Sequence, residues 1–382
     1  MGRDHQRPIR PSRAPSTTDI AGRRLEAQRL AGNPLDGPAE VVGWLGAVQA
    51  QDYPAAVWAV GQRTRGATAA DVHRLFDEGA IVRTHVLRPT WHLVLPGDLR
   101  WLLALTAPRL RAGLAGRWHA LGIDAGVIAG AQAAFQAALT GGRQLTRTEL
   151  GAVLQASGIA PDGQRLPHLI MAAELDALVV SGPRRGRDFT YMLLDERVPV
   201  TPPLDPEEAM GRLAETYFRS RGPAQVQDFA WWSGTTLAGA RGGVAAAAAS
   251  LTSEVTGGRR YWAAALPPPP PRPPRAPVVH LLPNFDELTV AYRDRSATDH
   301  PRGLFDPGLF AFGSVLSNVL VIGGRVRGAW RRVAGPRSLR LQLRLLDPLR
   351  PAERAAVGRE VDRMSRFLER PVELEWPDGQ AG

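Results

Sequence analysis

The stretch Thr68–Leu95, TAADVHRLFDEGAIVRTHVLRPTWHLVL, decides the fold of the first part of the chain. Thr68 stands where a helix N-cap is expected, and Asp71 completes a capping box three residues later. Gly79 is a typical helix stop, and two β-rich segments follow it. The predicted elements are a helix over Ala69–Glu78 and strands over Ile81–Val86 and Thr90–Leu95. This stretch therefore predicts a helix followed by a β-hairpin.

Helix–helix–hairpin order recurs along the chain. The first copy begins with helices over Arg23–Ala31 and Ala39–Leu45. The second has a capping box at Thr146 and Glu149, a helix stop at Gly158, a helix from Pro167 to Leu175, and strands over Leu178–Ser181 and Phe189–Leu193. The third has helices over Glu207–Ser220, Ala224–Trp232 and Val244–Ser250 and strands over Thr252–Val255 and Arg260–Trp262. The pattern predicts an α+β protein with three tandem winged-helix modules, and a generic α+β fold without a repeat is the alternative.

A proline tract, Pro267–Pro277, separates this array from the C-terminal part and is typical of a stiff linker. Beyond it, strands are predicted over Val278–Leu282, Asn318–Ile322 and Arg325–Trp330, and a closing helix carries Val357, Val361, Met364 and Leu368 on one face. This predicts a β-rich, barrel-like domain. The expected boundaries are 1–20 for a disordered Arg/Pro-rich tail, 21–110, 111–200 and 201–266 for the three modules, 267–277 for the linker, and 278–382 for the C-terminal domain.

Composition excludes several classes of protein. The 382 residues contain no cysteine, which excludes disulfides and thiolate metal sites. No apolar run approaches the roughly 20 residues needed to cross a bilayer, and the N-terminus resembles no signal peptide. Metalloprotease, P-loop and dinucleotide motifs are absent, and the eight histidines lack metal-ligand spacing. We therefore expect a cytoplasmic protein with no metal and no cofactor.

The net charge of +10, with a pI near 11.0, indicates a polyanionic partner. All 47 basic residues are arginine, a compositional bias that weakens any single arginine as a functional signal. Residues 321–370 hold thirteen arginines against five acids, a net of +8. If the partner is nucleic acid, we expect the C-terminal region to hold much of the nucleic-acid backbone, and we expect the protein to be associated with the nucleoid.

Gln49 and Gln51 form the most informative local pattern. Side chains at i and i+2 share a face only in extended backbone, and Gly46 and Pro54 favour such a segment between them. Two amides that face one point can hold a water molecule without ionising. A polar helix-to-loop junction is the alternative. A second such pair, in Gln225-Val226-Gln227, falls inside a predicted helix, where the amides would diverge.

Other candidate site residues are basic, aromatic or acidic. One group lies on the first predicted hairpin: Arg88, Thr90, Trp91 and His92. If the strand persists, Arg88, Thr90 and His92 alternate onto one face that could meet a phosphate or a base, and a core strand with an ordinary buried histidine is the alternative. Arg184, Arg185 and Arg187 lie at a predicted hairpin tip, where they could straddle a groove or keep a surface loop soluble. Arg325 and Arg327 share a face of the last predicted hairpin, where they could probe a groove or lie on a solvated edge. Asp286, beside Glu287, is the best carboxylate candidate, either to polarise water or, more in keeping with its spacing, to anchor Arg293.

The chain resembles the AlkZ-type winged-helix DNA glycosylases, the family of azinomycin-resistance and interstrand cross-link glycosylases. The resemblance covers most of residues 25–335 and rests on five stretches: GAVQAQDYP at Gly46–Pro54, RPTWHLV at Arg88–Val94, GPAQVQDFAWWSG at Gly222–Gly234, LLPNFDELTVAYRDR at Leu281–Arg295 and GRVRGAWR at Gly324–Arg331. The family signature is Gln–aliphatic–Gln, and Gln49-Ala50-Gln51 matches it. A related branch has Asp in the last position, which this chain does not.

The resemblance implies a monofunctional DNA glycosylase that removes bulky cationic N-alkylpurines from double-stranded DNA as a monomer, with Gln49 and Gln51 as the catalytic residues. It also implies winged helices around a barrel. The alternatives are a non-catalytic winged-helix regulator, for which the candidate recognition helix His168–Leu175 offers few long polar side chains, and a partner-binding protein that uses the proline tract.

Overall fold

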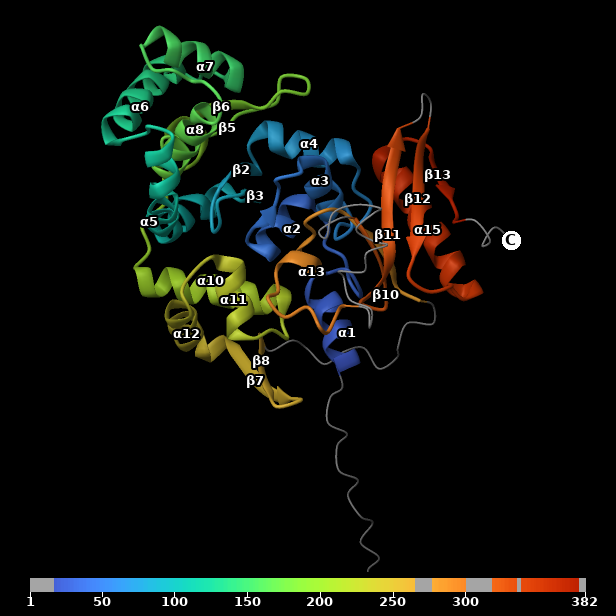
Figure 1. Cartoon of the computed structure of the whole chain (residues 1–382). Coiled ribbons are helices and arrows are strands. Elements are labelled where there is room, and N and C mark those ends of the chain that lie inside the picture. The colour runs from blue at the N-terminus through green and yellow to red at the C-terminus, as the bar shows by residue number, and fades with distance from the viewer. Residues whose placement is uncertain (1–16, 265–276, 300–317, 335–337, 378–382) are drawn as a thin grey trace, which may run out of the picture.

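Helices and four sheets make up the part of the chain that the computed structural model describes, residues 17–264, 277–299, 318–334 and 338–377 (Figure 1). Three of the sheets are small, with two or three strands, and follow one another along the chain. The fourth has five strands and curls into a half-barrel. The predicted mixture of helix and sheet is therefore confirmed.

The first module contains the Gln49 segment. Its elements are α1 (Thr17–Ala27), α2 (Pro38–Leu45), β1 (Val48–Gln49), α3 (Tyr53–Gly61), α4 (Ala69–Glu78), β2 (Val82–His85) and β3 (Trp91–Val94). The predicted capping box is present, because Thr68 and Asp71 bond each other's backbone N–H groups. Gly79 ends α4 in the left-handed conformation, with a φ of 86° that favours glycine. The strands form an antiparallel sheet in the order β1-β3-β2.

The predicted disordered tail is wrong for residues 17–20, which form the first turn of α1. Ile20 is fully buried against Tyr261 and Ala297, so a contact with distant segments fixes this turn. Residues 1–16 lie outside the described part of the chain.

The second module follows a long helix and has its own core. Its elements are α5 (Pro96–Ala120), α6 (Ala125–Leu139), β4 (Leu145–Thr146), α7 (Arg147–Ala156), α8 (Arg165–Leu175), β5 (Val179–Ser181), β6 (Thr190–Leu193) and α9 (Leu194–Arg197). The capping box of Thr146 and Glu149 is confirmed. The sheet order β4-β6-β5 repeats the arrangement of the first module. Phe135, Leu150 and Leu169 lie in the core between the helices.

The third module has two strands instead of three. Its elements are α10 (Pro206–Arg221), α11 (Val226–Ser233), α12 (Leu237–Ala246), a short 3-10 turn (Ala248–Ser250), β7 (Leu251–Thr256) and β8 (Arg259–Ala264). The predicted helix over Val244–Ser250 is wrong in its bounds, because Thr236 caps a helix that starts earlier. Glycine weakens a helix locally, but a Cβ at Gly243 would lie 2.9 Å from Met210 of α10. Close packing of the two helices therefore selects glycine here.

The C-terminal part contains the curled sheet. Its elements are β9 (Val279–Leu282), α13 (Glu287–Val290), β10 (Val319–Ile322), β11 (Arg325–Ala334), β12 (Leu339–Leu345), α15 (Pro351–Leu368) and β13 (Val372–Glu375). The strand order is β13-β12-β11-β10-β9, and Gly323-Gly324 makes the predicted turn between β10 and β11. Val357, Val361 and Met364 of α15 are buried against the sheet, as predicted. The predicted linker lies outside the described residues except for Pro277.

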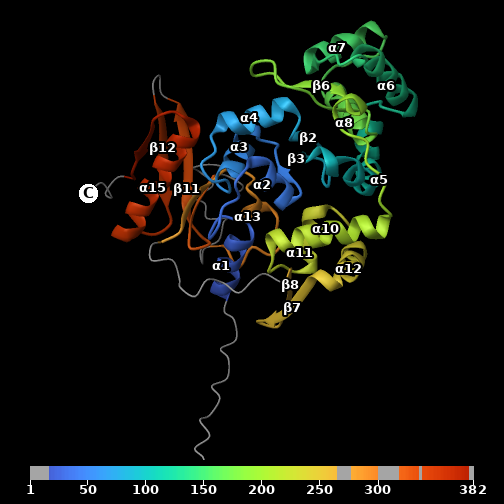
Figure 2. The same cartoon turned by 180° about the vertical axis from the view of Figure 1, so that it is seen from behind.

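The first module lies between the other parts of the molecule. Figures 1 and 2, from opposite sides, both place it between the C-terminal sheet and the second and third modules. Helix α10 contacts α2 and α5, α8 contacts β2, and α15 contacts α4. The elements around β1 are therefore held by parts of the chain far apart in the sequence.

Glu360 on α15 is a buried acid that gives a stability prediction. Its carboxylate lies 4.0 Å from His280 Nδ1 and 3.6 Å from Arg363, and burial raises its pKa from 4.5 to about 7. Burial lowers the pKa of His280 to about 3, so the imidazole is neutral and does not compensate the carboxylate. A buried acid whose folded pKa is raised makes the protein less stable as pH rises from the unfolded to the folded pKa.

We expect Glu360→Gln to raise the free energy of unfolding more at pH 8 than at pH 4.5. The difference between the two pH values is expected to be roughly 3 kcal/mol, from about 1.4 kcal/mol per pKa unit. Urea unfolding of both proteins at the two pH values measures it. An equal effect of the substitution at both pH values would show that the carboxyl group titrates normally.

Candidate functional site

Gln49 and Gln51 leave the sheet at the start of α3. Gln49 ends β1 opposite His92 of β3, and the Ala50 N–H still donates to the Trp91 carbonyl, 2.7 Å away. Asp52 then caps α3 by accepting the Ala55 N–H at 3.1 Å. The backbone is therefore extended through the first glutamine and helical two residues after the second. The predicted extended exit from a helix is present.

The two amides differ in exposure. Gln49 is 6% exposed and its side-chain oxygen accepts the backbone N–H of Gln51 at 3.2 Å. Gln51 is exposed to solvent, and no hydrogen bond of its side-chain amide occurs within the described residues. The Gln49 amide thus fixes the turn on which the Gln51 amide is presented.

A buried ion pair holds the backbone of this segment. The Glu287 carboxylate accepts the Gln49 N–H at 3.0 Å, the Trp232 indole N–H at 3.0 Å, and the guanidinium of Arg221 at 2.6 and 3.0 Å. The same Arg221 donates to the carbonyls of Leu45 and Ala47. Glu287 and Arg221 are fully buried, and together they bind the backbone of the segment before Gln51 from two other parts of the chain.

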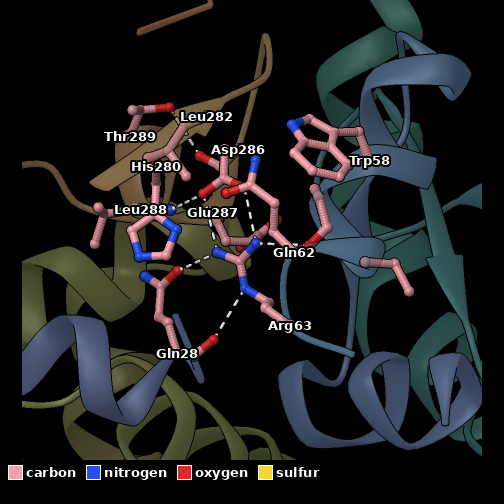
Figure 3. Close-up of polar contacts among 12 residues, drawn as sticks. Gln28, Trp58, Gln62, Arg63, His280, Leu282, Asp286, Glu287, Leu288 and Thr289 are labelled. Atoms are coloured by element: carbon pink, nitrogen blue, oxygen red, sulfur yellow. Dashed lines mark hydrogen bonds and ion pairs between the residues drawn. The ribbon is translucent and has the colours of Figure 1, made fainter. Parts of the chain in front are cut away.

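Asp286 has a structural role. Figure 3 shows its carboxylate beside Arg63, and the two oxygens accept from the guanidinium at 2.8 and 2.9 Å. Arg63 also donates to Gln28, and Asp286 caps α13 through the Leu288 N–H. The suggested anchoring of Arg293 is not seen in the described residues, where both Asp286 oxygens accept from Arg63 instead.

His92 is a neutral residue of the sheet. It is fully buried, and burial together with the nearby Arg88 charge holds its pKa well below the ordinary 6.5. Its Nδ1 lies 2.9 Å from the Thr90 carbonyl, which requires the proton on Nδ1 and leaves Nε2 as an acceptor. His92 Nε2, Thr90 Oγ1 and Arg88 Nε are all buried without a partner in the described residues.

The predicted shared face of Arg88, Thr90 and His92 is not formed by a strand. β3 begins only at Trp91, and Leu87 at φ 65° starts a turn that contains Arg88 and Thr90. The cause is packing, because Leu87 is buried in the main core and its carbonyl lies against Gly234. The Arg88 guanidinium still reaches His92 electrostatically.

Most of the predicted basic hairpin residues are paired. Arg184 binds both oxygens of Asp77, at 2.7 and 3.1 Å, and Arg185 donates to Glu149. Arg327 donates to Glu353. The remaining two arginines lie in different surroundings. Arg325 is half-buried at the start of β11, and Arg187 is exposed at the rim of a cavity. The hairpin arginines thus do not form one cluster with the glutamines.

Three functional candidates were missed from the sequence: Glu287, Arg221 and Arg83. Arg83 of β2 donates from Nε to the Ala50 carbonyl at 3.1 Å, directly between the two glutamines. The acidic pair Asp286-Glu287 inside an apolar stretch was a usable signal for Glu287. Nothing local marks Arg83 or Arg221 in a chain whose basic residues are all arginine.

Neither a metal site nor a membrane span is found among the described residues. No group of three His, Asp or Glu side chains is arranged to hold a metal ion there. No helix in that part of the chain is long and apolar enough to cross a membrane.

Comparison with known proteins gives a consistent result. The structure is similar to the Streptomyces sahachiroi DNA glycosylase AlkZ, with a TM-score of 0.70 and 21% sequence identity over 95% of this chain and 100% of that one. No curated protein matches the sequence. The model of the family described as DNA glycosylase AlkZ-like matches residues 42–367, which contain the glutamine pair and both ion pairs. The chain therefore belongs to the AlkZ-like family of DNA glycosylases.

Proposed function

We propose that this DNA glycosylase hydrolyses the N-glycosidic bond of cationic N-alkylpurines, such as bulky N7-guanine or N3-adenine adducts, with Gln49 and Gln51 as its catalytic residues. The observation that carries the proposal is that the neighbouring carboxylates already accept hydrogen bonds within the protein. Asp52 is used as the cap of α3, and Glu287 accepts Arg221, Trp232 and the Gln49 N–H. The polar group left for solvent is the Gln51 amide.

An amide suits a leaving group that is already charged. N-glycoside hydrolysis passes through an oxocarbenium-like transition state, as glycoside hydrolysis does. An N7-alkylguanine departs as a neutral base, so no general acid is required. What remains is to orient a water molecule and to stabilise the cationic sugar. A glutamine carbonyl oxygen accepts a hydrogen bond from water and directs its dipole at the sugar.

The exposure of Gln51 also favours bulky substrates. A base that is linked to the opposite strand cannot be fully extruded into a closed pocket. An amide presented at the surface on a fixed turn reaches such a base without full extrusion. We therefore include interstrand cross-links among the proposed substrates, in general repair or in self-resistance to a DNA-alkylating agent, both in the cytoplasm at the nucleoid.

We further propose that the three modules are winged-helix units. The first two each combine helices with a three-stranded antiparallel sheet, and the third has a two-stranded one. The alternative of a transcriptional regulator is less well supported, because α8 is not available for reading bases. His168 of α8 accepts the Trp118 indole N–H, and Leu169, Ile170 and Leu175 are buried.

The charge of the lesion provides the test. We expect the protein to excise N7-alkylguanine from a duplex oligonucleotide, and to remove uracil more slowly by about 10²–10⁴, the usual contribution of the general acid that an amide cannot replace. Scission at the resulting abasic site measures both rates. Equal rates on the two bases would contradict amide catalysis. Duplex binding with no excision of either base would favour the non-catalytic alternative.

A further inference from the structure

A cavity of about 360 Å³ lies between the first and second modules, on the side of β2 and β3 that carries Arg83 and Trp91. Its other walls come from the start of α7 and from the β5–β6 hairpin with β6. The lining residues are Arg83, Trp91, Thr146, Arg147, Thr148, Arg187, Asp188, Phe189 and Tyr191. Three arginines face one aspartate, so the lining carries a net charge of +2.

Arg83 is a buried cation with free donors. The residue is 8% exposed, and the only hydrogen bond of its side chain within the described residues is from Nε to the Ala50 carbonyl. Burial lowers its pKa, and the buried Glu174 that favours its charge is itself bonded to His85. The two terminal nitrogens therefore lack a carboxylate partner.

Two aromatic rings lie against this guanidinium. Its central carbon lies 4.3 Å from the centre of the Trp91 ring and 4.6 Å from that of Phe189. These two rings pack against the guanidinium, and its N–H edge matches the oxygens of a phosphate. The ring faces of Trp91 and Phe189 that Arg83 covers are not free to stack on a base.

Helix α7 adds donors from the opposite wall. Arg147 and Thr148 are its first two residues, and their backbone N–H groups have no acceptor within the helix. The third N–H, of Glu149, is taken by Thr146 Oγ1. The first turn of a ten-residue helix thus opens on the same cavity as Arg83, an arrangement that favours an anion.

We propose that this cavity binds a backbone phosphate of the DNA strand, next to the nucleotide whose base is removed. The position follows from the Arg83–Ala50 bond, which places the guanidinium one residue from Gln51. The place of this phosphate next to the target nucleotide rests on the proposed function, because a phosphate bound here fixes the DNA strand relative to the glutamine amides. It also explains why a buried arginine remains unpaired.

Salt dependence of binding to an undamaged duplex tests the contact without any chemistry. Each phosphate contact contributes about 0.9 to the slope of log K against log salt. We expect Arg83→Gln to lower the magnitude of that slope by about 0.9 and to weaken binding by about 10-fold, the usual value of a charge-assisted hydrogen bond. Arg147→Gln is expected to change the slope in the same direction. The change in slope of the double variant should be smaller than the sum of the two single changes, because both side chains hold one phosphate.

Arg143→Gln is the matched control. Arg143 is an exposed arginine of the same module whose guanidinium donates to the carbonyls of Thr140 and Ala137, outside the cavity. It is expected to leave the slope unchanged. An unchanged slope in Arg83→Gln and Arg147→Gln, or an equal loss in Arg143→Gln, would overturn the proposal. A weaker complex with an unchanged slope would show that Arg83 acts only by supporting the Ala50 turn.

Position is tested by excision from duplexes in which single phosphates flanking the lesion are replaced by neutral methylphosphonates. One flanking replacement is expected to slow the wild-type protein by about 10-fold, and to slow Arg147→Gln much less. A wild-type rate that is insensitive to every flanking replacement overturns the assigned position. A different result is that inorganic phosphate stabilises the folded wild-type protein but not Arg83→Gln, while the salt slope of DNA binding is the same in both. That result would assign the cavity to a free anion. A catalytically inactive protein can still pass the salt test, so the two proposals fail separately.

Discussion

Replacing Gln51 by alanine should lower the single-turnover rate of N7-alkylguanine excision by about 10²–10³, the cost of removing one positioned dipole at a developing charge. Duplex affinity should change little, because the Gln51 side chain makes no contact that holds the fold in the described residues. Single-turnover rates and fluorescence anisotropy on the same duplex separate the two quantities. A residual rate is expected, since the alkylated base already weakens its own bond.

Gln49→Ala should have an effect of similar size for a second reason. The Gln49 oxygen accepts the Gln51 N–H, so its removal also frees the turn that carries Gln51. The double variant should therefore lose less than the product of the two single losses, because the amides act as a unit. Equal abasic-site yields from wild type, both single variants and the double variant would remove the proposed catalytic pair.

Gln227→Ala is the matched control for these variants. Gln227 ends the second Gln-x-Gln in the chain and is exposed on α11. The prediction that this whole triplet lies in a helix is only partly correct, because Gln225 is the N-cap of α11 and bonds Asp294. Replacing Gln227 by alanine should leave both excision and stability unchanged. A loss of excision there would show that exposed glutamines matter for DNA binding in general.

Local signals were sufficient to place the glutamines. Gly46 adopts a positive φ of 73° at the end of α2, and α3 begins at Tyr53 beside Pro54, so the segment between them is extended. The capping boxes of Thr68 and Thr146 mark helices correctly for the same reason. These features depend on residues within a few positions of one another, and the sequence displays such residues directly.

Long-range contacts could not be predicted in this way. Gln49 and Glu287 are 238 positions apart, and periodicity does not show which segment lies beside which. Because all basic residues are arginine, composition does not distinguish the buried Arg63, Arg83 and Arg221 from surface arginines. The arginines of the predicted hairpin tip are largely paired with acids. The expectation that the C-terminal arginines hold DNA stays a prediction, and one of them, Arg363, instead donates to carbonyls of the first module.

Asp286→Ala should lower the free energy of unfolding by about 3–5 kcal/mol, the usual cost of leaving one member of a buried ion pair alone. Arg63 and Asp286 are completely buried, and the pair is bidentate at 2.8 and 2.9 Å. The substitution leaves the Arg63 guanidinium with only the neutral acceptors of Gln28 and Ala59. Urea unfolding near neutral pH measures the loss.

Asp36→Ala is the control for the general effect of losing an acid. Its pair with Arg65, at 3.2 Å, is exposed, with 64% and 79% of the two side chains accessible. Such pairs contribute at most about 1 kcal/mol. Arg63→Met combined with Asp286→Leu should recover part of the loss, because no charge is then left uncompensated. Similar losses in Asp286→Ala and Asp36→Ala would show that water compensates the Arg63 charge.

The Asp286 and Gln51 variants should also differ in how activity responds to temperature. Asp286 caps α13, whose first residue, Glu287, holds the Gln49 N–H. Destabilising this helix therefore lowers excision by populating molecules in which the Gln49 turn is released. Cooling the assay below the unfolding transition should restore most of the rate of Asp286→Ala. Gln51→Ala should gain nothing from cooling, because its defect lies in the transition state. An Asp286→Ala rate that stays as low as that of Gln51→Ala while the protein is fully folded would place this carboxylate in the chemistry.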